Sequence, residues 1–179
     1  FITEISFGCI RYRKFLDLWI DHTSKFTHKK QPPKLRWLLH IGLYQLLKMD
    51  KIPYSAAIST SVEVAKQTDL RGLSGVVNAI LRNASQKFQK KDFPSIPNNN
   101  ICRISYEESL PNWLVKEIID WVGLKKASNI AASFNKRPNI DLRINPLKGD
   151  VDEMILALKK EKILASKIEN LKTGIELRT

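Results

Sequence analysis

Hydrophobic residues in the first half of the chain recur at every third or fourth position, which is the spacing of an amphipathic helix. The clearest stripe lies within residues 73–88 and a second lies within residues 35–47, while residues 14–22 and 54–68 show the same spacing over shorter stretches. No segment before residue 93 alternates convincingly as a strand does. The sequence therefore predicts a bundle of four or five helices, which makes the fold class mainly α.

The second half of the chain mixes helical and strand patterns. Residues 111–122 and 125–134 have helical spacing, whereas residues 140–144 alternate apolar and polar side chains as a half-buried strand does. A further helix and two short strand-like pieces follow, at residues 152–160, 163–168 and 174–177. We therefore expect two short helices and then the start of a truncated α/β (RRM-like) module.

A proline- and asparagine-rich segment separates these two patterns. Pro94, Pro97 and three consecutive asparagines interrupt any helical reading there. We accordingly predict a helical bundle at residues 1–93, a linker at 94–110, and a helical connector with an incomplete α/β module at 111–179. Because the chain begins inside a helical pattern without a methionine and ends just after a strand-like stretch, we expect it to be a fragment, truncated at its N-terminus.

Composition and charge limit the classes of molecule that the chain is expected to bind. With 43% hydrophobic and 27% charged residues the chain is typical of a soluble globular protein, and no apolar run is long enough to span a membrane. The net charge is +12, of which residues 1–93 carry +9 (16 Lys and Arg against 7 Asp and Glu) and the rest +3 (14 against 11). Nucleic acid is therefore the first partner to test, although a basic face that only keeps the protein soluble is an alternative.

The positive charge is concentrated in two runs without any acidic residue, at residues 22–49 and 70–91. Trp37, beside Lys34 and Arg36, is the aromatic residue singled out for RNA contact, since the remaining tryptophans read as core residues. The RNA-binding candidates come from these runs, from the start of the chain and from the flanks of the first predicted strand. They are Arg11, Arg13, Lys29, Lys30, Lys34, Arg36, Arg82, Lys87, Lys90, Lys91, Arg137 and Arg143.

The sequence offers no catalytic, cofactor-binding or metal-binding set. It contains no glycine-rich nucleotide loop and no nucleophile beside a plausible base. The three histidines lack the spacing of a metal pair, so we expect no metal. Cys9 and Cys102 are far apart and read as ordinary thiols, which fits a reducing compartment and predicts a cytoplasmic protein.

Several local strings resemble one family, the RsmB (Sun, Fmu) 16S rRNA cytosine-C5 methyltransferases, whose N-terminal part is similar to the antitermination factor NusB. In the first half the strings are Phe7–Arg13, Leu43–Leu46 with Asp50, Ile52, Pro53, Ala56 and Ala57, and Val77–Arg82. In the second half they are Pro111–Val115, Asn135–Pro138 and Leu142–Pro146. The resemblance runs nearly end to end, and its second half distinguishes the RsmB family from free NusB.

The chemistry that this resemblance implies lies mostly outside the chain. In the family a Rossmann-like domain binds S-adenosylmethionine, one cysteine attacks C6 of the cytosine, and a second, in a Pro-Cys motif, assists removal of the C5 proton. This sequence has no Pro-Cys, so neither Cys9 nor Cys102 inherits those roles, and we expect the fragment alone to be inactive. The sequence also departs from the family pattern at Leu110, where an aromatic residue is usual, and at Asn139, where a proline is common.

The resemblance therefore implies the RNA-binding N-terminal region of an S-adenosylmethionine-dependent 16S rRNA methyltransferase, with ribosomal RNA as partner and no membrane attachment. One alternative is a stand-alone NusB-like factor that acts in antitermination or rRNA processing without catalysis. Another is a protein-interaction bundle whose charge is incidental. Self-association stays open.

Overall fold

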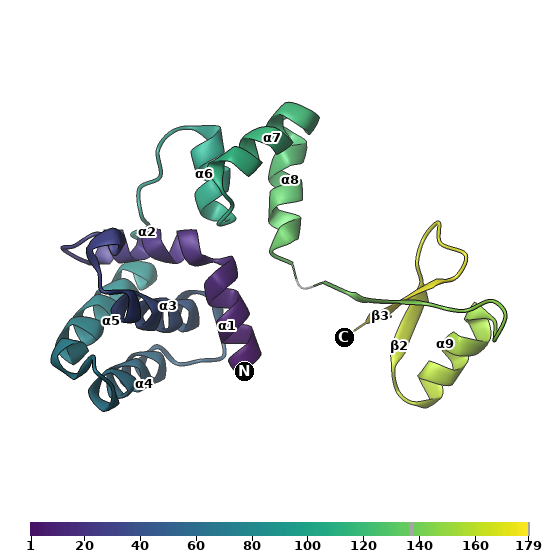
Figure 1. Ribbon diagram of the computed structural model, residues 1–179, viewed down its shortest axis with the longest axis horizontal. Helices are drawn as coiled ribbons and strands as arrows, with labels where there is room; N and C mark the ends of the chain where they lie inside the picture. The colour runs from purple at the N-terminus through teal and green to yellow at the C-terminus, as the bar shows by residue number, and fades with distance from the viewer. Residues whose placement is uncertain (137, 179) are drawn as a thin grey trace. The chain divides into compact units, whose positions relative to one another are not determined.

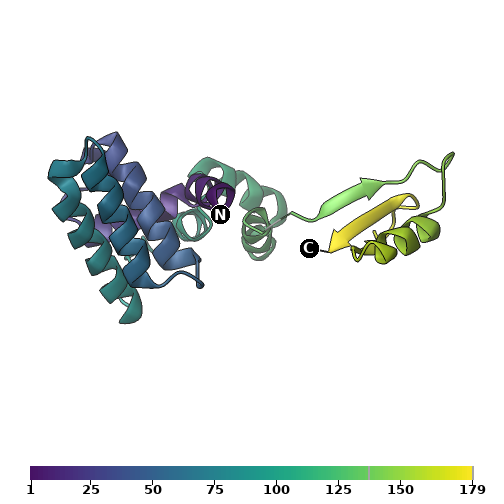
Figure 2. The same cartoon turned by 90° about the horizontal axis from the view of Figure 1, so that it is seen from below.

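A helical bundle occupies the start of the chain in the computed structural model, which describes residues 1–136 and 138–178. This part contains five α-helices joined by short connections that include two 3-10 turns, and Figures 1 and 2 show the helices packed side by side. The helices are α1 (Ile2–Arg11), α2 (Arg13–Thr23), α3 (Pro33–Lys48), α4 (Tyr54–Gln67) and α5 (Ser74–Gln89). The 3-10 turns lie at His28–Lys30 and Arg71–Leu73.

Helix α3 is the centre of the bundle. It packs against α1, α2, α4 and α5, and its residues 42–47 are all buried. The C-terminal half of α3 is apolar around most of its circumference and needs neighbours on several sides, which accounts for its central place. Pro33 lies in the first turn of α3, where the missing N–H has no helical partner in any case.

The bundle core follows the predicted stripes. Side chains of α2, α3 and α5 interlock there with essentially no exposure, and burial of each stabilises the fold by about 1.5–3 kcal/mol. They are Leu16, Trp19, Ile20, Leu39, Leu43, Val77 and Leu81. The predicted helical bundle is confirmed.

The segment 94–110 differs from the expected linker, because a helix, α6 (Asn100–Glu107), forms inside it. The side chain of Asn99 accepts hydrogen bonds from the backbone N–H groups of Ile101 (2.8 Å) and Cys102 (3.3 Å). An asparagine in this position starts a helix rather than breaking one. The linker prediction is therefore wrong for residues 100–107, where the asparagine run caps a helix.

Helix α6 packs with α7 (Asn112–Val122) and α8 (Leu124–Phe134) around Ile104 and Val115. Lys14 of α2 donates hydrogen bonds to the hydroxyl of Ser105 and to Oδ1 of Asn112, the latter at 2.7 Å. These contacts join the three helices to the bundle, so residues 1–135 form one compact unit and the residues from 136 onward form another.

The second unit contains a small antiparallel sheet of strand order β1-β3-β2, built from β1 (Ile140–Arg143), β2 (Leu164–Lys167) and β3 (Gly174–Arg178). Helix α9 (Val151–Lys160) lies between β1 and β2 in sequence and packs against the sheet. Leu142 pairs with Ile175 across β1 and β3, and Ile175 is fully buried with Ile144 and Val151. The predicted order of strand, helix, strand and strand is confirmed.

Candidate nucleic-acid interface

The two basic runs meet at one end of the bundle, because the last turn of α2 packs against the C-terminal half of α5. The side-chain amide of Asn83 donates a hydrogen bond of 2.9 Å to the backbone carbonyl of Thr23, 60 residues away in sequence. His22 contacts Asp92 at 3.2 Å, and the ring of Trp19 packs edge-on against Phe88. These contacts bring the first residues of one basic run next to the end of the other.

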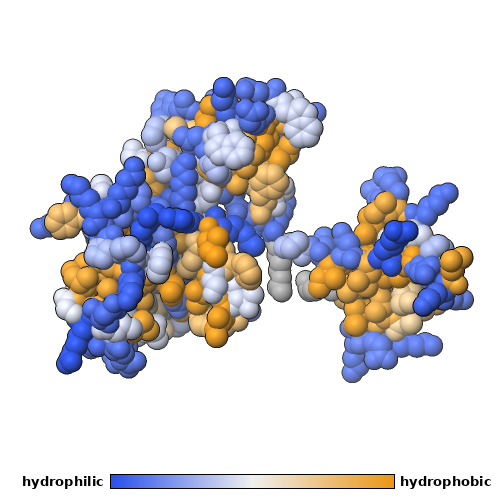
Figure 3. All heavy atoms as spheres, viewed as in Figure 1, coloured by the Kyte–Doolittle hydropathy of each residue, from blue (hydrophilic) through white to orange (hydrophobic). Residues whose placement is uncertain are grey.

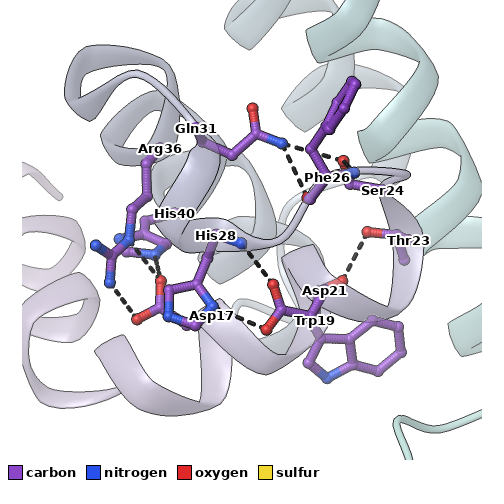
Figure 4. Close-up of polar contacts among 10 residues, drawn as sticks. All are labelled: Asp17, Trp19, Asp21, Thr23, Ser24, Phe26, His28, Gln31, Arg36 and His40. Carbon is purple, nitrogen blue, oxygen red and sulfur yellow. Dashed lines mark hydrogen bonds and ion pairs between the residues drawn. The ribbon is translucent and has the colours of Figure 1, made fainter.

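The few acidic side chains at the start of the chain all form hydrogen bonds or ion pairs with other residues of the chain. Residues 1–48 hold nine Lys and Arg but only three acids, Glu4, Asp17 and Asp21. Glu4 accepts a hydrogen bond of 2.7 Å from the hydroxyl of Tyr44. Asp21 accepts the backbone N–H of His28 at 2.5 Å and contacts its ring Nδ1 at 2.8 Å (Figure 4).

Asp17 is the centre of a buried ion-pair network (Figure 4). Its carboxylate accepts hydrogen bonds from Nε (2.7 Å) and Nη2 of Arg36 and contacts Nε2 of His40 at 2.8 Å. Burial alone would raise the pKa of Asp17, but the bonds from His40 and Arg36 outweigh it and lower the pKa to about 2. With its guanidinium held between helices, Arg36 has a partner inside the bundle, which favours a structural role over phosphate contact.

Two further RNA candidates make exposed ion pairs. Lys34 contacts Asp69 at 2.5 Å, and Lys87 contacts Asp92 at 2.5 Å. The run at 70–91 is therefore not unopposed in space, because Asp92 follows it directly. Pairs at this exposure are worth about 0–1 kcal/mol, so a phosphate can replace the carboxylate at small cost.

The other candidate cations of the first unit reach the surface, and none makes an ion pair within the described part of the chain. Lys29 and Lys30 lie in the first 3-10 turn, and Lys90 and Lys91 follow α5. Arg11 and Arg13 lie where α1 meets α2. In the second unit Arg143 is exposed on β1, while Arg137 lies outside the described residues.

Arg82 borders a groove of mixed polar and apolar lining between α4 and α5. Its Nε donates a hydrogen bond of 2.9 Å to Oδ1 of Asn78 one turn earlier, so Asn78 positions Arg82. The groove has a volume of about 790 Å³, and hydroxyl and amide groups line it beside the guanidinium, together with apolar side chains, Lys66 and the acidic Glu63. The hydroxyl and amide groups are suited to hydrogen bonding with ribose and phosphate. The sequence analysis missed Ser55, Ser59, Ser85 and Gln86, whose only signal is helical spacing along the two facing helices.

Cys9, whose thiol is free, is half-buried in the bundle. Burial raises the pKa of the Cys9 thiol to about 11, so the thiol stays protonated near neutral pH. Among residues 1–136 and 138–178, no cluster of His, Cys, Asp or Glu is placed to hold a metal ion. No helix in the same residues combines the length and apolar character needed to cross a membrane.

Comparison with protein families assigns both halves of the chain. Residues 1–86 match the NusB family. Residues 110–179 match the ferredoxin-like domain of the RsmF/B-like methyltransferases. The chain is therefore a NusB-like helical domain followed by an RsmF/B-type ferredoxin-like domain.

Curated relatives match nearly the whole length of the chain. A probable ribosomal RNA small subunit methyltransferase B of Synechocystis sp. is 34% identical over 177 residues, covering 99% of this chain and 39% of the relative. The protein of the same name in Bacillus subtilis is 31% identical, covering 98% of this chain and 39% of the relative. A ribosomal RNA small subunit methyltransferase B of Vibrio vulnificus is 31% identical over 90% of this chain and 36% of the relative.

A solved structure titled "Crystal Structure of PH0851" shares the fold, with a TM-score of 0.68 at 18% sequence identity over 99% of this chain and 39% of that chain. Together the matches show a chain whose first part is similar to the NusB family and whose second part is similar to the ferredoxin-like domain of the RsmF/B-like methyltransferases. The chain spans about two fifths of the length of the curated relatives it matches.

Proposed function

We propose that the chain is the RNA-binding N-terminal region of an S-adenosylmethionine-dependent methyltransferase that modifies C5 of a cytosine in 16S rRNA. The observation that carries the proposal is the basic end of the NusB-like bundle, where two cationic runs meet and the nearby acids are already bonded. Each phosphate neutralised there releases condensed counterions, so binding is driven electrostatically and weakens with salt.

In this account the bundle binds structured RNA, and the remainder of the parent protein catalyses the methyl transfer. A target base inside a duplex must be extruded before methylation, so tight positioning of the surrounding RNA is a requirement. The methyl donor is assigned to no residue of this chain.

The match of residues 110–179 favours the methyltransferase over a stand-alone NusB-like factor, because that second domain is of the RsmF/B type. The printed names of the relatives, ribosomal RNA small subunit methyltransferase B, support ribosomal RNA as the partner. The cytosine-C5 position and a cytoplasmic location come from the sequence resemblance and belong to the proposal.

The test compares two sets of lysine-to-glutamine substitutions in the whole chain, measured by binding to a fragment of small-subunit rRNA. One set changes Lys29, Lys30, Lys90 and Lys91 at the basic end of the bundle. The matched control removes the same charge from the second unit, at exposed Lys148, Lys159, Lys160 and Lys172.

We expect the first set to weaken binding at least tenfold and the control set to weaken it far less. Equal losses from both sets would show that only net charge matters, and this would refute the bundle as the RNA-binding region. A wild-type chain that binds rRNA no better than an acidic control protein at low salt would refute the function itself.

A further inference from the structure

An apolar groove lies between α1 and α3, on a different part of the bundle from the α4–α5 groove. It has a volume of about 330 Å³, and its walls are mainly Cys9 and Ile10 of α1 and Trp37 and Ile41 of α3, with Arg13 at the start of α2. Figure 3 shows apolar side chains at the surface over α1. This groove takes no part in the polar surface described above.

The ring of Trp37 is exposed at this groove. Trp37 is 61% exposed, whereas Trp19 of the same bundle is fully buried. Trp113 (67%) and Trp121 (80%) are exposed as well, so the prediction that they are core residues is wrong. Ile10, 72% exposed, lies in the same groove. Water contact with so much apolar surface costs about 25 cal/mol per Å², so an occupant that covers the ring gains affinity.

The charged side chains around the groove indicate which kind of ligand it can bind. Arg13 is exposed at the rim and makes no ion pair among the described residues. The nearest acids are already bonded, Glu4 to Tyr44 and Asp17 to Arg36 and His40. The groove thus combines an apolar floor with an uncompensated positive rim, and it fits a ligand that is flat, apolar and attached to a negative charge.

We propose that this groove binds an unpaired RNA base, which stacks on the indole of Trp37 while its phosphate lies at the guanidinium of Arg13. Stacking on an aromatic ring is open to every base, and a duplex does not offer it because its bases are already stacked. A second copy of the chain is a poor occupant, since it would bring two cationic rims together. The inference rests on the proposed RNA-binding function and adds a site for single-stranded RNA.

The test uses the whole chain with a labelled single-stranded oligoadenylate and an A·U RNA duplex of the same length. Trp37→Ala removes the stacking ring and Trp37→Phe keeps an aromatic face. Trp121→Ala is the matched control, because Trp121 of α7 is 80% exposed and lies outside the groove. Thermal unfolding of each variant establishes that it folds.

Stacking of one base is worth about 1–3 kcal/mol, so Trp37→Ala should weaken binding of the single strand by about 5- to 150-fold. Duplex binding should stay within about twofold of wild type, and both Trp37→Phe and Trp121→Ala should bind the single strand nearly as wild type does. Arg13→Gln should weaken the single strand and reduce the salt dependence of its binding.

Unchanged single-strand binding by folded Trp37→Ala would overturn the stacking site while leaving the proposed function intact. Equal losses for single strand and duplex would also overturn it. Trp37-dependent binding of a short amphipathic peptide of leucine and glutamate, with RNA binding unaffected, would assign the groove to a protein partner instead. If the wild-type chain bound neither RNA, the proposed function would fail together with the inference.

Discussion

Gly8 of α1 lies so close to Tyr44 of α3 that a Cβ atom on Gly8 would stand 2.1 Å from Cζ of the tyrosine ring. The Tyr44 hydroxyl in turn donates a hydrogen bond to Glu4, one turn before Gly8 on α1. The close approach lets α1 pack directly on the central helix. It gives a physical reason for a glycine in the string Phe7–Arg13 and a tyrosine in Leu43–Leu46.

Gly8→Ala should therefore destabilise the bundle by about 1–3 kcal/mol, the usual cost of overpacking, even though alanine favours a helix. The free energy of unfolding in urea measures this cost. Gly75→Ala in α5 is the control, because a Cβ there meets nothing within 4 Å, and it should leave stability unchanged or slightly higher. Equal effects at both glycines would contradict the close α1–α3 contact.

The ion pair of Asp17 predicts an acid-sensitive contribution to stability. The pKa of its carboxyl falls from 3.8 to about 2 in the folded chain, so the ionised form stabilises the fold above about pH 4. That contribution, about 2 kcal/mol from the pKa difference, is lost as the pH falls from about 4 to 2. Unfolding free energies across this range should show the loss in wild type.

Asp17→Asn should remove that part of the pH dependence and cost about 3 kcal/mol at neutral pH, since Arg36 and His40 lose their charged partner. Asp120→Asn, on the exposed side of α7, should keep the wild-type profile. The account of the network fails if Asp17→Asn retains the full acid-induced loss of stability.

Substitutions at Arg36 and Lys90 should have opposite effects, one mainly on the stability of the fold and the other mainly on RNA affinity. Arg36→Gln breaks the bond to Asp17 and should lower the free energy of unfolding by about 2–3 kcal/mol, with a small effect on RNA affinity. Lys90→Gln should do the reverse, because Lys90 is exposed. Parallel titrations with rRNA and with urea compare the two variants, and a reversed order would return Arg36 to the RNA-contacting surface.

Lys14 should control how firmly α6 and α7 attach to the bundle. Lys14→Met removes the hydrogen bonds to Ser105 and Asn112, so cleavage by a protease within residues 94–110 should speed up several-fold. Lys51→Met, at an exposed position with no such partners, should leave the cleavage rate unchanged. If the two variants were cleaved alike, the attachment would depend on apolar contacts alone.

Local patterns predicted most of the helices and strands, whereas contacts between distant residues escaped the sequence analysis. The helical stripes of α3 and α5 depend on nearby spacing, which a sequence displays directly. Asn99 was read as part of a helix-breaking run, although its side chain caps α6. The ion pair of Arg36 with Asp17 joins residues that are 19 positions apart. The local sequence around Arg36 contains no acidic residue that would predict this pair.

The salt dependence of rRNA binding by the whole chain tests the central claim most directly. We expect the logarithm of the association constant to fall linearly with the logarithm of salt concentration. The slope should be about −2 or steeper, since the exposed lysines at the basic end of the bundle engage at least about three phosphates at about −0.7 to −0.9 each. A slope near zero, or no measurable binding at the lowest salt concentration, would contradict the assignment of this chain as an RNA-binding region.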